Sequence, residues 1–205
     1  MMFLIPLDPF IWILGKSPAI NIEFKLNIII FRCARGEYLK TLAQETNNVV
    51  VKDKNLLGVE IRRPVVEDAQ KNIIAPSRVH VMYSNVSIHL QDLVKSLNAP
   101  ITSVSIFHPD PWFKAKHHRR RLVNIAFCTT LADVVQDGCD VYLQTDVKEL
   151  SLDMVDIFRS CDVYKELDNH PTENPLGVAS DREAAVLREG GVIYRHHFRV
   201  VHNNS

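Results

Sequence analysis

Short runs rich in β-branched residues alternate along the chain with segments of helical spacing, and this alternation limits the folds that it can adopt. Strand-like and helix-like segments alternate about five times, which predicts an α/β domain with a mostly parallel sheet. The expected strands cover residues 22–31, 56–61, 79–83, 102–107, 138–145 and 191–201. The expected helices cover residues 36–44, 64–72, 87–97, 119–135 and 148–159.

Ligands of parallel α/β sheets bind beyond the carboxyl ends of the strands. The residues that directly follow the expected strands should therefore converge on one rim of the sheet. They are residues 33–36, Glu60, Ser84 and Asn85, residues 108–112, and Thr145 and Asp146. Residues 170–179, with two prolines and a glycine, predict a long loop.

Lysines plus arginines equal aspartates plus glutamates at 24 each, so any basic run is a local feature. The four cysteines lie far apart and predict reduced thiols in an intracellular protein, with no disulfide framework and no metal site. The apolar first 15 residues contain Pro6, Asp8 and Pro9. They are a poor match to a signal peptide and too short for a membrane span.

The segment HPDPWFKAKHHRRR, residues 108–121, places an acid and an indole beside many cations. Asp110 stands between two prolines, which fix the backbone and suit a carboxylate that must be aimed. Trp112 offers a flat ring for a purine. A rigid surface turn with Trp112 packed on the core remains the alternative. The cations that follow indicate either contacts to a polyanion or a solvated face.

Two further features fit a nucleoside ligand. Glu60 ends a short apolar strand, where an acid either takes ribose hydroxyls or forms a salt bridge with Arg62 or Arg63. The turn from Cys33 to Gly36 has one glycine at a helix start, where backbone N–H groups face a ligand. This turn is not a GxGxxG motif, so a dinucleotide site is not predicted.

The order of several motifs resembles the tRNA (guanine-N7)-methyltransferase family. The motifs are RGEYL, LLGVEIRRPVVE, SNV, HPDPWFKAKHHRRRLV, QTD, and SDRE before IYRHHF. The resemblance implies a class I S-adenosylmethionine-dependent, Rossmann-like α/β fold with a mostly parallel seven-stranded sheet and helices on both faces. A single methyltransferase domain would cover residues 27–205, and residues 1–26 form an atypical segment outside the resemblance.

The resemblance implies methyl transfer from S-adenosylmethionine to N7 of guanine 46 in the tRNA variable loop, leaving S-adenosylhomocysteine. No metal would be needed. The partner would be tRNA rather than a membrane, and the chain would act as a monomer or homodimer without an obligate partner subunit. The segment NPLGVASDREAAVL looks most like cyanobacterial or plastid members, which implies a cytoplasmic or plastid location.

The resemblance also carries roles onto single positions. Asp110 would be the catalytic residue. The donor would be held by Cys33, Gly36, Glu60, Asn85 and Asp110. The substrate would be held by Lys114, Asp146, Ser180, Asp181, Arg182 and Glu183. The tRNA phosphates would contact Lys116, His117, Arg119, Arg120 and Arg121.

The chain departs from the family at its first motif. Ile30 stands where the family has an acid, and Arg32 stands where it has its first glycine. Either the protein is active despite an altered N-terminal part, or it is a catalytically weak tRNA-binding or RNA-binding paralogue with a degraded donor site. A methyltransferase for a small molecule is a third reading, which would leave the basic run without a role.

Overall fold

The computed structural model of the chain describes residues 27–45, 47–72, 78–97, 99–168 and 171–202. The atypical N-terminal segment, and residues 22–26 of the first expected strand, lie outside the described residues. The strands are β1 Asn27–Phe31, β2 Asn55–Glu60, β3 Val79–Tyr83, β4 Ile101–Phe107, β5 Asp140–Thr145, β6 Tyr164–Glu166 and β7 Tyr194–Val200. The helices are α1 Glu37–Gln44, α2 Arg63–Asn72, α3 Val86–Leu97, α4 Ile125–Val134, α5 Lys148–Arg159 and α6 Asp181–Arg188, with a 3₁₀-helix at Ala115–Arg120.

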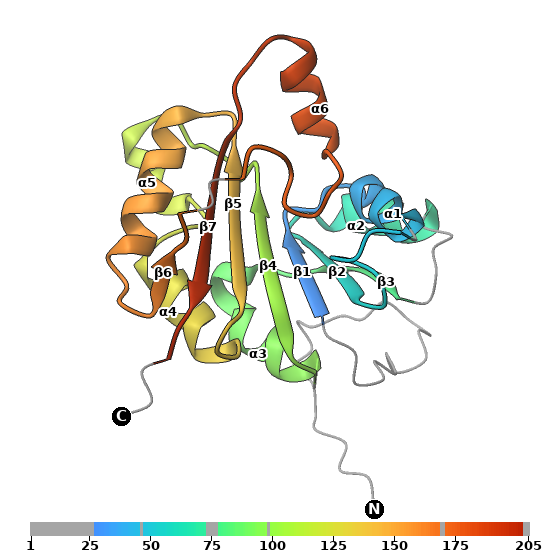
Figure 1. Cartoon of the computed structure of the whole chain (residues 1–205), viewed down its shortest axis with the longest axis horizontal. Helices are drawn as coiled ribbons and strands as arrows, with labels where there is room; N and C mark the ends of the chain where they lie inside the picture. The colour runs from blue at the N-terminus through green and yellow to red at the C-terminus, as the bar shows by residue number, and fades with distance from the viewer. Residues whose placement is uncertain (1–26, 46, 73–77, 98, 169–170, 203–205) are drawn as a thin grey trace, which may run out of the picture.

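One seven-stranded sheet runs through the described part of the chain in the order β3-β2-β1-β4-β5-β7-β6 (Figure 1). The pairs from β3 to β5 are all parallel, whereas β7 is antiparallel to both β5 and β6. The expected mostly parallel seven-stranded sheet is therefore confirmed. None of the helices in the described ranges is long and apolar enough to cross a membrane.

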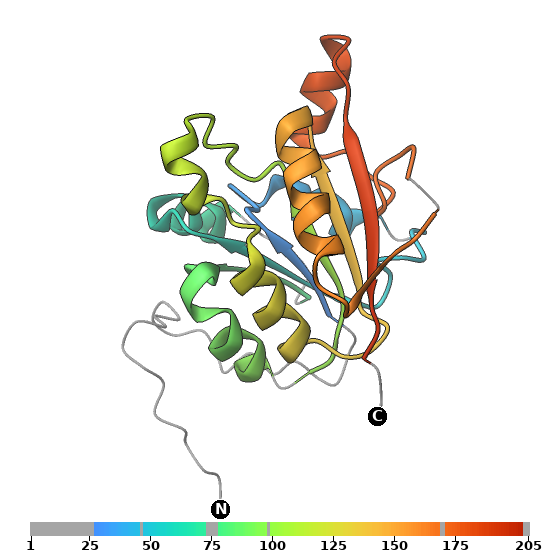
Figure 2. The same ribbon diagram turned by 90° about the vertical axis from the view of Figure 1, so that its left-hand side faces the viewer.

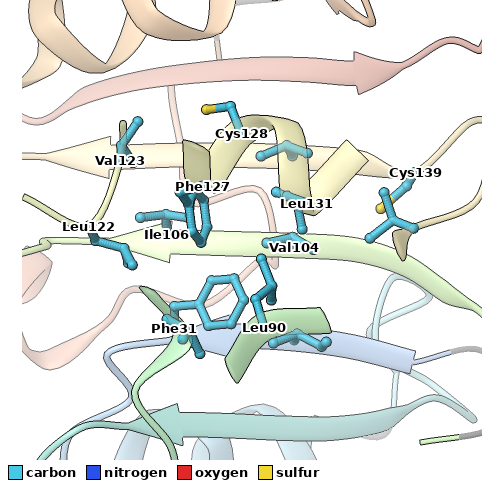
Figure 3. Packing of buried hydrophobic residues seen from close by; sticks show 14 of the residues in the cluster. Phe31, Leu90, Val104, Ile106, Leu122, Val123, Phe127, Cys128, Leu131 and Cys139 are labelled. Carbon is cyan, nitrogen blue, oxygen red and sulfur yellow. The ribbon is translucent and has the colours of Figure 1, made fainter. Parts of the chain in front are cut away.

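The sheet buries both of its faces, because successive residues of a strand point to opposite sides. Ile29 and Phe31 join the core beneath α3, α4 and α5, which lie side by side in Figure 2. Figure 3 shows this core, in which Phe31 packs edge-on against Phe127 with ring centroids 5.8 Å apart. Ile28 and Ile30 join a second core beneath α1 and α2. A strand buried on both faces explains why NIIIF reads as a continuous apolar run.

Three elements differ from the sequence expectation. The expected helix over residues 119–135 is instead a 3₁₀-helix that ends at Arg120 and a later helix, α4, that begins at Ile125. Asn124 caps α4, and its side chain accepts from the Phe127 N–H at 3.0 Å. The strand β6 and the helix α6 were not expected. β6 has only three residues, which is too few for a periodic pattern.

Gly58 lets α1 and the loop after β1 pack closely on β2. A Cβ atom at this position would lie 2.3 Å from Leu39 Cδ1 and 2.6 Å from Cys33 Sγ. We expect Gly58→Ala to lower the free energy of unfolding by about 1–3 kcal/mol through overpacking. Urea titration followed by circular dichroism measures this, and an unchanged midpoint and slope would contradict the close packing.

Candidate active site at the carboxyl ends of the strands

A cavity of about 730 Å³ lies beyond the carboxyl ends of the parallel strands. Its walls come from the loops after β1, β2, β4 and β5 and from the start of α6, which stands over this edge of the sheet in Figure 1. The cavity is lined by Cys33, Glu60, Asp110, Asp146, and residues 180–182. Of the residues expected on the rim, residues 33–35, Glu60, residues 108–111, Thr145 and Asp146 line this cavity, and the first turn of α6 joins them.

A second cavity of about 400 Å³ lies beside the first and is lined by Asn85, Trp112 and the basic segment at Arg119 and Arg120. Arg32 and Asp110 line both cavities. The two residues therefore stand at the boundary between them.

Arg32 forms an ion pair with Asp110 at this boundary. The backbone of Arg32 has a φ of 64°, in the left-handed region that favours glycine. Its N–H donates to the Val59 carbonyl at 2.8 Å, which fixes the loop on β2. The loop thus keeps a glycine-type conformation at the position where the resemblance expects glycine, and places a guanidinium there.

Glu60 has a fully buried side chain with several donors around it. Its carboxylate accepts from Arg62 Nε at 3.0 Å and from the backbone N–H groups of Ala34 at 3.2 Å and Ile61 at 3.0 Å. Burial alone would raise the pKa of Glu60, but the hydrogen bonds from Arg62 and the charge of Arg32 bring it below its ordinary value. The salt bridge between Glu60 and Arg62, one of the two alternatives from the sequence, is present, and Glu60 also lines the cavity.

Cys33 and Gly36 shape the loop after β1 rather than offering reactive groups. Gly36 has a φ of 76° at the start of α1. The Cys33 thiol is buried against the Gly58 backbone, and burial raises its pKa to about 12. The thiol therefore stays protonated near neutral pH and cannot serve as a nucleophile.

Asp146 lies on the opposite wall of the cavity and has two partners. His108 Nδ1 lies 3.0 Å from Asp146 Oδ1, and Arg182 donates to Oδ2. Burial would raise the pKa of Asp146, but the hydrogen bonds from Arg182 and His108 lower it. The carboxylate is therefore ionised at neutral pH. Ser180 and Asp181 lie next to it at the start of α6.

Two residues do not stand where their expected roles would need them. Arg121 was expected to contact tRNA phosphate, but its side chain is only 4% exposed and pairs with Glu149 and Asp153, each at 2.9 Å. Glu183 was expected to contact the substrate, but it is buried and accepts from Asn174, Gln144 and Arg195. Its side chain also accepts from the Ser180 N–H, completing the capping box of α6. Both are structural anchors, whose burial the sequence pattern does not reveal.

The other cations of the basic segment remain available. Lys114, Lys116, Arg119 and Arg120 are exposed, and His117 is half-buried. The guanidinium of Arg120 lies 5.1 Å from the Trp112 ring centroid, and Trp112 lines the second cavity instead of joining either core. The alternative of a tryptophan packed on the core is therefore wrong.

Two residues to which the sequence reasoning gave no role also line the larger cavity, although His108 was among the residues expected on the rim. Phe113 is 71% exposed, and an exposed ring at a cavity is a surface on which a base can stack. His108 contacts Asp146 and has a φ of 48°. Both lie inside the HPDPWF run, which directly follows a strand. This position was the sequence feature that could have indicated a role for them in the site.

A family model described as "Putative methyltransferase" matches residues 29–196. The tRNA (guanine-N(7)-)-methyltransferase of Thermosynechococcus vestitus is 35% identical over 169 residues, which are 81% of this chain and 76% of that protein. The chain belongs to the tRNA (guanine-N7)-methyltransferase family. The protein of the same name from Synechococcus elongatus is 38% identical over 80% of this chain and 76% of its own length. The one from Synechococcus sp. strain JA-3-3Ab is 37% identical, and the match spans 66% of its length.

Solved structures agree with this family at the level of the fold. The aminoglycoside resistance methyltransferase NpmB1 gives a TM-score of 0.57 at 15% identity over 89% of this chain and 90% of that one. The N-methyltransferase NodS from Bradyrhizobium japonicum, in complex with S-adenosyl-L-homocysteine, gives 0.54 at 8% identity over 89% and 81%. Their sequences are too different to carry over more than the fold.

The site of this family member fits an S-adenosylmethionine-type donor at one end and restricts it at the other. Glu60 lies buried at the cavity wall with its carboxylate facing the loop after β1, which suits ribose hydroxyls. At the boundary between the two cavities Arg32 is paired with Asp110. Ile30 is 2% exposed and offers no polar group.

We expect Arg121 to contribute to the free energy of unfolding and Arg119 to contribute to ligand binding instead. The Arg121 guanidinium also donates to the Pro111 carbonyl at 2.8 Å, which ties the Asp110 turn to α5. We expect Arg121→Gln to destabilise the protein by about 2 kcal/mol, the scale of lost charged hydrogen bonds. The matched variant Arg119→Gln should change stability by less than about 0.5 kcal/mol. Denaturant titration measures both, and equal midpoints for the two variants would contradict the anchoring role.

Proposed function

We propose that this chain transfers the methyl group of S-adenosylmethionine to N7 of a guanine in tRNA, and that this guanine is at position 46 of the variable loop. The observation that carries the proposal is the place of Asp110. It stands at the boundary of two adjacent cavities, in the turn that precedes the exposed cation run starting at Lys114. The relatives of the same family carry this activity in their names.

The chemistry asks little of the protein beyond placement. S-adenosylmethionine supplies an electrophilic methyl group on a cationic sulfur, which leaves as a neutral thioether. Guanine N7 has a lone pair and no proton, so the attack needs no general base. Positioning the two reactants in line supplies most of the acceleration. The Asp110 carboxylate stabilises the positive charge that develops on the guanine.

The remaining residues of the site bind the methyl donor or the tRNA substrate. Glu60 holds the donor's ribose, Asn85 lies near its adenine, and the loop at Cys33 and Gly36 approaches it with backbone. On the substrate side, Lys114, Asp146 and residues 180–182 hold the guanosine. The exposed cations Lys116, His117, Arg119 and Arg120 contact tRNA phosphates, which fix the register without reading sequence.

The protein would act as a monomer or homodimer in a compartment that contains tRNA, either the cytoplasm or a plastid. A catalytically weak tRNA-binding paralogue is the second candidate. The ion pair between Arg32 and Asp110 favours it, because this pair engages the proposed catalytic carboxylate within the chain itself.

Donor binding distinguishes the two candidates. We expect calorimetric titration with S-adenosylmethionine to show saturable binding to the unaltered chain. Arg32→Gly should bind up to about fivefold more tightly, because a partly exposed ion pair worth about 1 kcal/mol no longer competes. Arg63→Gly is the matched control, since Arg63 pairs with Glu67 and lines neither cavity.

The second candidate function, a catalytically weak paralogue, predicts no donor binding by the unaltered chain. The paralogue hypothesis holds if the folded, unaltered chain does not bind the donor while the double variant Ile30→Asp and Arg32→Gly does. That result would reject the proposal that the unaltered chain is an active enzyme. A circular dichroism spectrum of each variant excludes loss of folding as the cause.

The basic segment should set the salt dependence of tRNA binding. Replacing Lys114, Arg119 and Arg120 together by glutamine removes two proposed phosphate contacts and the positive charge of Lys114 beside the bound guanosine. We expect the slope of log K against log salt to become shallower by about 2–3. The matched control replaces Lys52, Lys71 and Lys95, which are exposed and lie ahead of the amino ends of β2, β3 and β4. Equal slopes in the two triple variants, with methyl transfer intact, would favour a small-molecule substrate.

A further inference from the structure

His108 stands between a buried amide and the proposed substrate acid. It directly follows β4, and its backbone N–H donates to the Gln144 carbonyl at 2.7 Å. One ring nitrogen, Nδ1, lies 3.0 Å from Asp146 Oδ1. The other, Nε2, lies 3.1 Å from Gln144 Nε2. The ring is therefore held at both of its nitrogens.

The surroundings of Gln144 fix which way its amide points. Its Nε2 lies 2.9 Å from a carboxylate oxygen of Glu183, so this nitrogen must donate. Its Oε1 accepts from Arg195 Nε at 3.1 Å. Turning the amide round would place oxygen against carboxylate and N–H against guanidinium. The observed orientation is thus the only one that satisfies both partners.

The amide in turn fixes the proton on His108. Because Gln144 Nε2 donates, His108 Nε2 must accept and carries no proton. The proton of the neutral ring then lies on Nδ1, which donates to Asp146. A doubly protonated ring would put two donors face to face at Gln144. The burial of His108 acts in the same direction, because it lowers the pKa of the ring.

The base of this network is rigid. Gln144 is fully buried, and Glu183 is 2% exposed. Glu183 is held by Arg195, by Asn174 at 2.7 Å, and by the capping box at the start of α6. The network therefore joins the first turn of α6, which lines the cavity, to the Asp146 wall.

We propose that His108 is a positioning residue, which Gln144 holds in one tautomer so that it orients the carboxylate of Asp146 toward the guanosine. The inference rests on the proposed function of Asp146 in binding the tRNA guanosine. His108 fixes Oδ1, while Oδ2 carries Arg182, whose side chain is 59% exposed. A donor group of the substrate can replace Arg182 at Oδ2 without disturbing the contact at Oδ1.

Two variants separate the effect of the hydrogen-bond donor of His108 from the effect of its ring. His108→Asn places an amide N–H near the position of Nδ1 and tolerates a positive φ. His108→Phe keeps a ring but has no donor. We expect kcat/KM for tRNA to fall about tenfold in His108→Phe and to recover largely in His108→Asn. The KM for S-adenosylmethionine should stay unchanged in both, because the donor side of the cavity is not touched.

A double-mutant cycle tests whether His108 acts through Asp146. In an Asp146→Ala background, His108→Phe should cause no further loss of kcat/KM, because the group that it orients is gone. Equal losses in both backgrounds would overturn the inference and leave a purely structural histidine. If the chain transfers no methyl groups, the same cycle is measured on tRNA affinity.

The tautomer gives a readout that needs no activity. Nitrogen NMR of histidine-labelled protein should show the His108 proton on Nδ1 near neutral pH, and a mixture of tautomers in Gln144→Met. A proton on Nε2 in the unaltered chain would overturn the inference even if methyl transfer is observed. A proton on Nδ1 in an inactive chain would support the hydrogen-bond network while the proposed function fails.

Discussion

The parallel pairing of β1 with both β2 and β4 determines where the central candidate residues of this protein lie. Three parallel neighbours end at the same edge, so Glu60 at the end of β2 meets the loops that contain Arg32 and Asp110 there. β5 extends the parallel set and adds Asp146. The register holds because β1 is buried on both faces, with apolar cores that pack against helices on either side. The chemistry of the rim therefore depends on a strand that carries no functional group of its own.

Each of the three carboxylates at the rim forms an ion pair with an arginine of the same chain. Glu60 pairs with Arg62, Asp110 with Arg32, and Asp146 with Arg182. Burial alone would raise the pKa values of Glu60 and Asp146, but hydrogen bonds from Arg62 and Arg182 lower them. In the proposed function each of the three carboxylates exchanges its guanidinium for a ligand group. Arg62 and Arg182 are largely exposed and lose little in such an exchange, whereas the Arg32 side chain is only 20% exposed and lies between the two cavities. Access to Asp110 is the step on which the two candidate functions differ.

Much of this arrangement was predictable because it depends on local patterns. Apolar runs with β-branched residues placed the longer strands, and the rule that ligands bind beyond parallel strands placed Glu60, Asp110 and Asp146 on one rim. The roles of Arg121 and Glu183 were not predictable, because both depend on partners about 30 to 40 residues away, such as Asp153 for Arg121 and Gln144 for Glu183. The helix α6 could have been recognised, since Ser180 and Glu183 have the spacing of a capping box. The contact between Arg32 and Asp110 joins loops 78 residues apart, which no local pattern encodes.

The most direct test of the account is to incubate the folded chain with unmodified tRNA and methyl-labelled S-adenosylmethionine and to identify the labelled nucleoside. The account predicts 7-methylguanosine, located at position 46 by chemical cleavage at the modified base, and its loss in Asp110→Asn. Label in any other nucleoside would contradict the assignment of N7. No label from a chain that binds both the donor and tRNA would contradict the proposed catalysis itself.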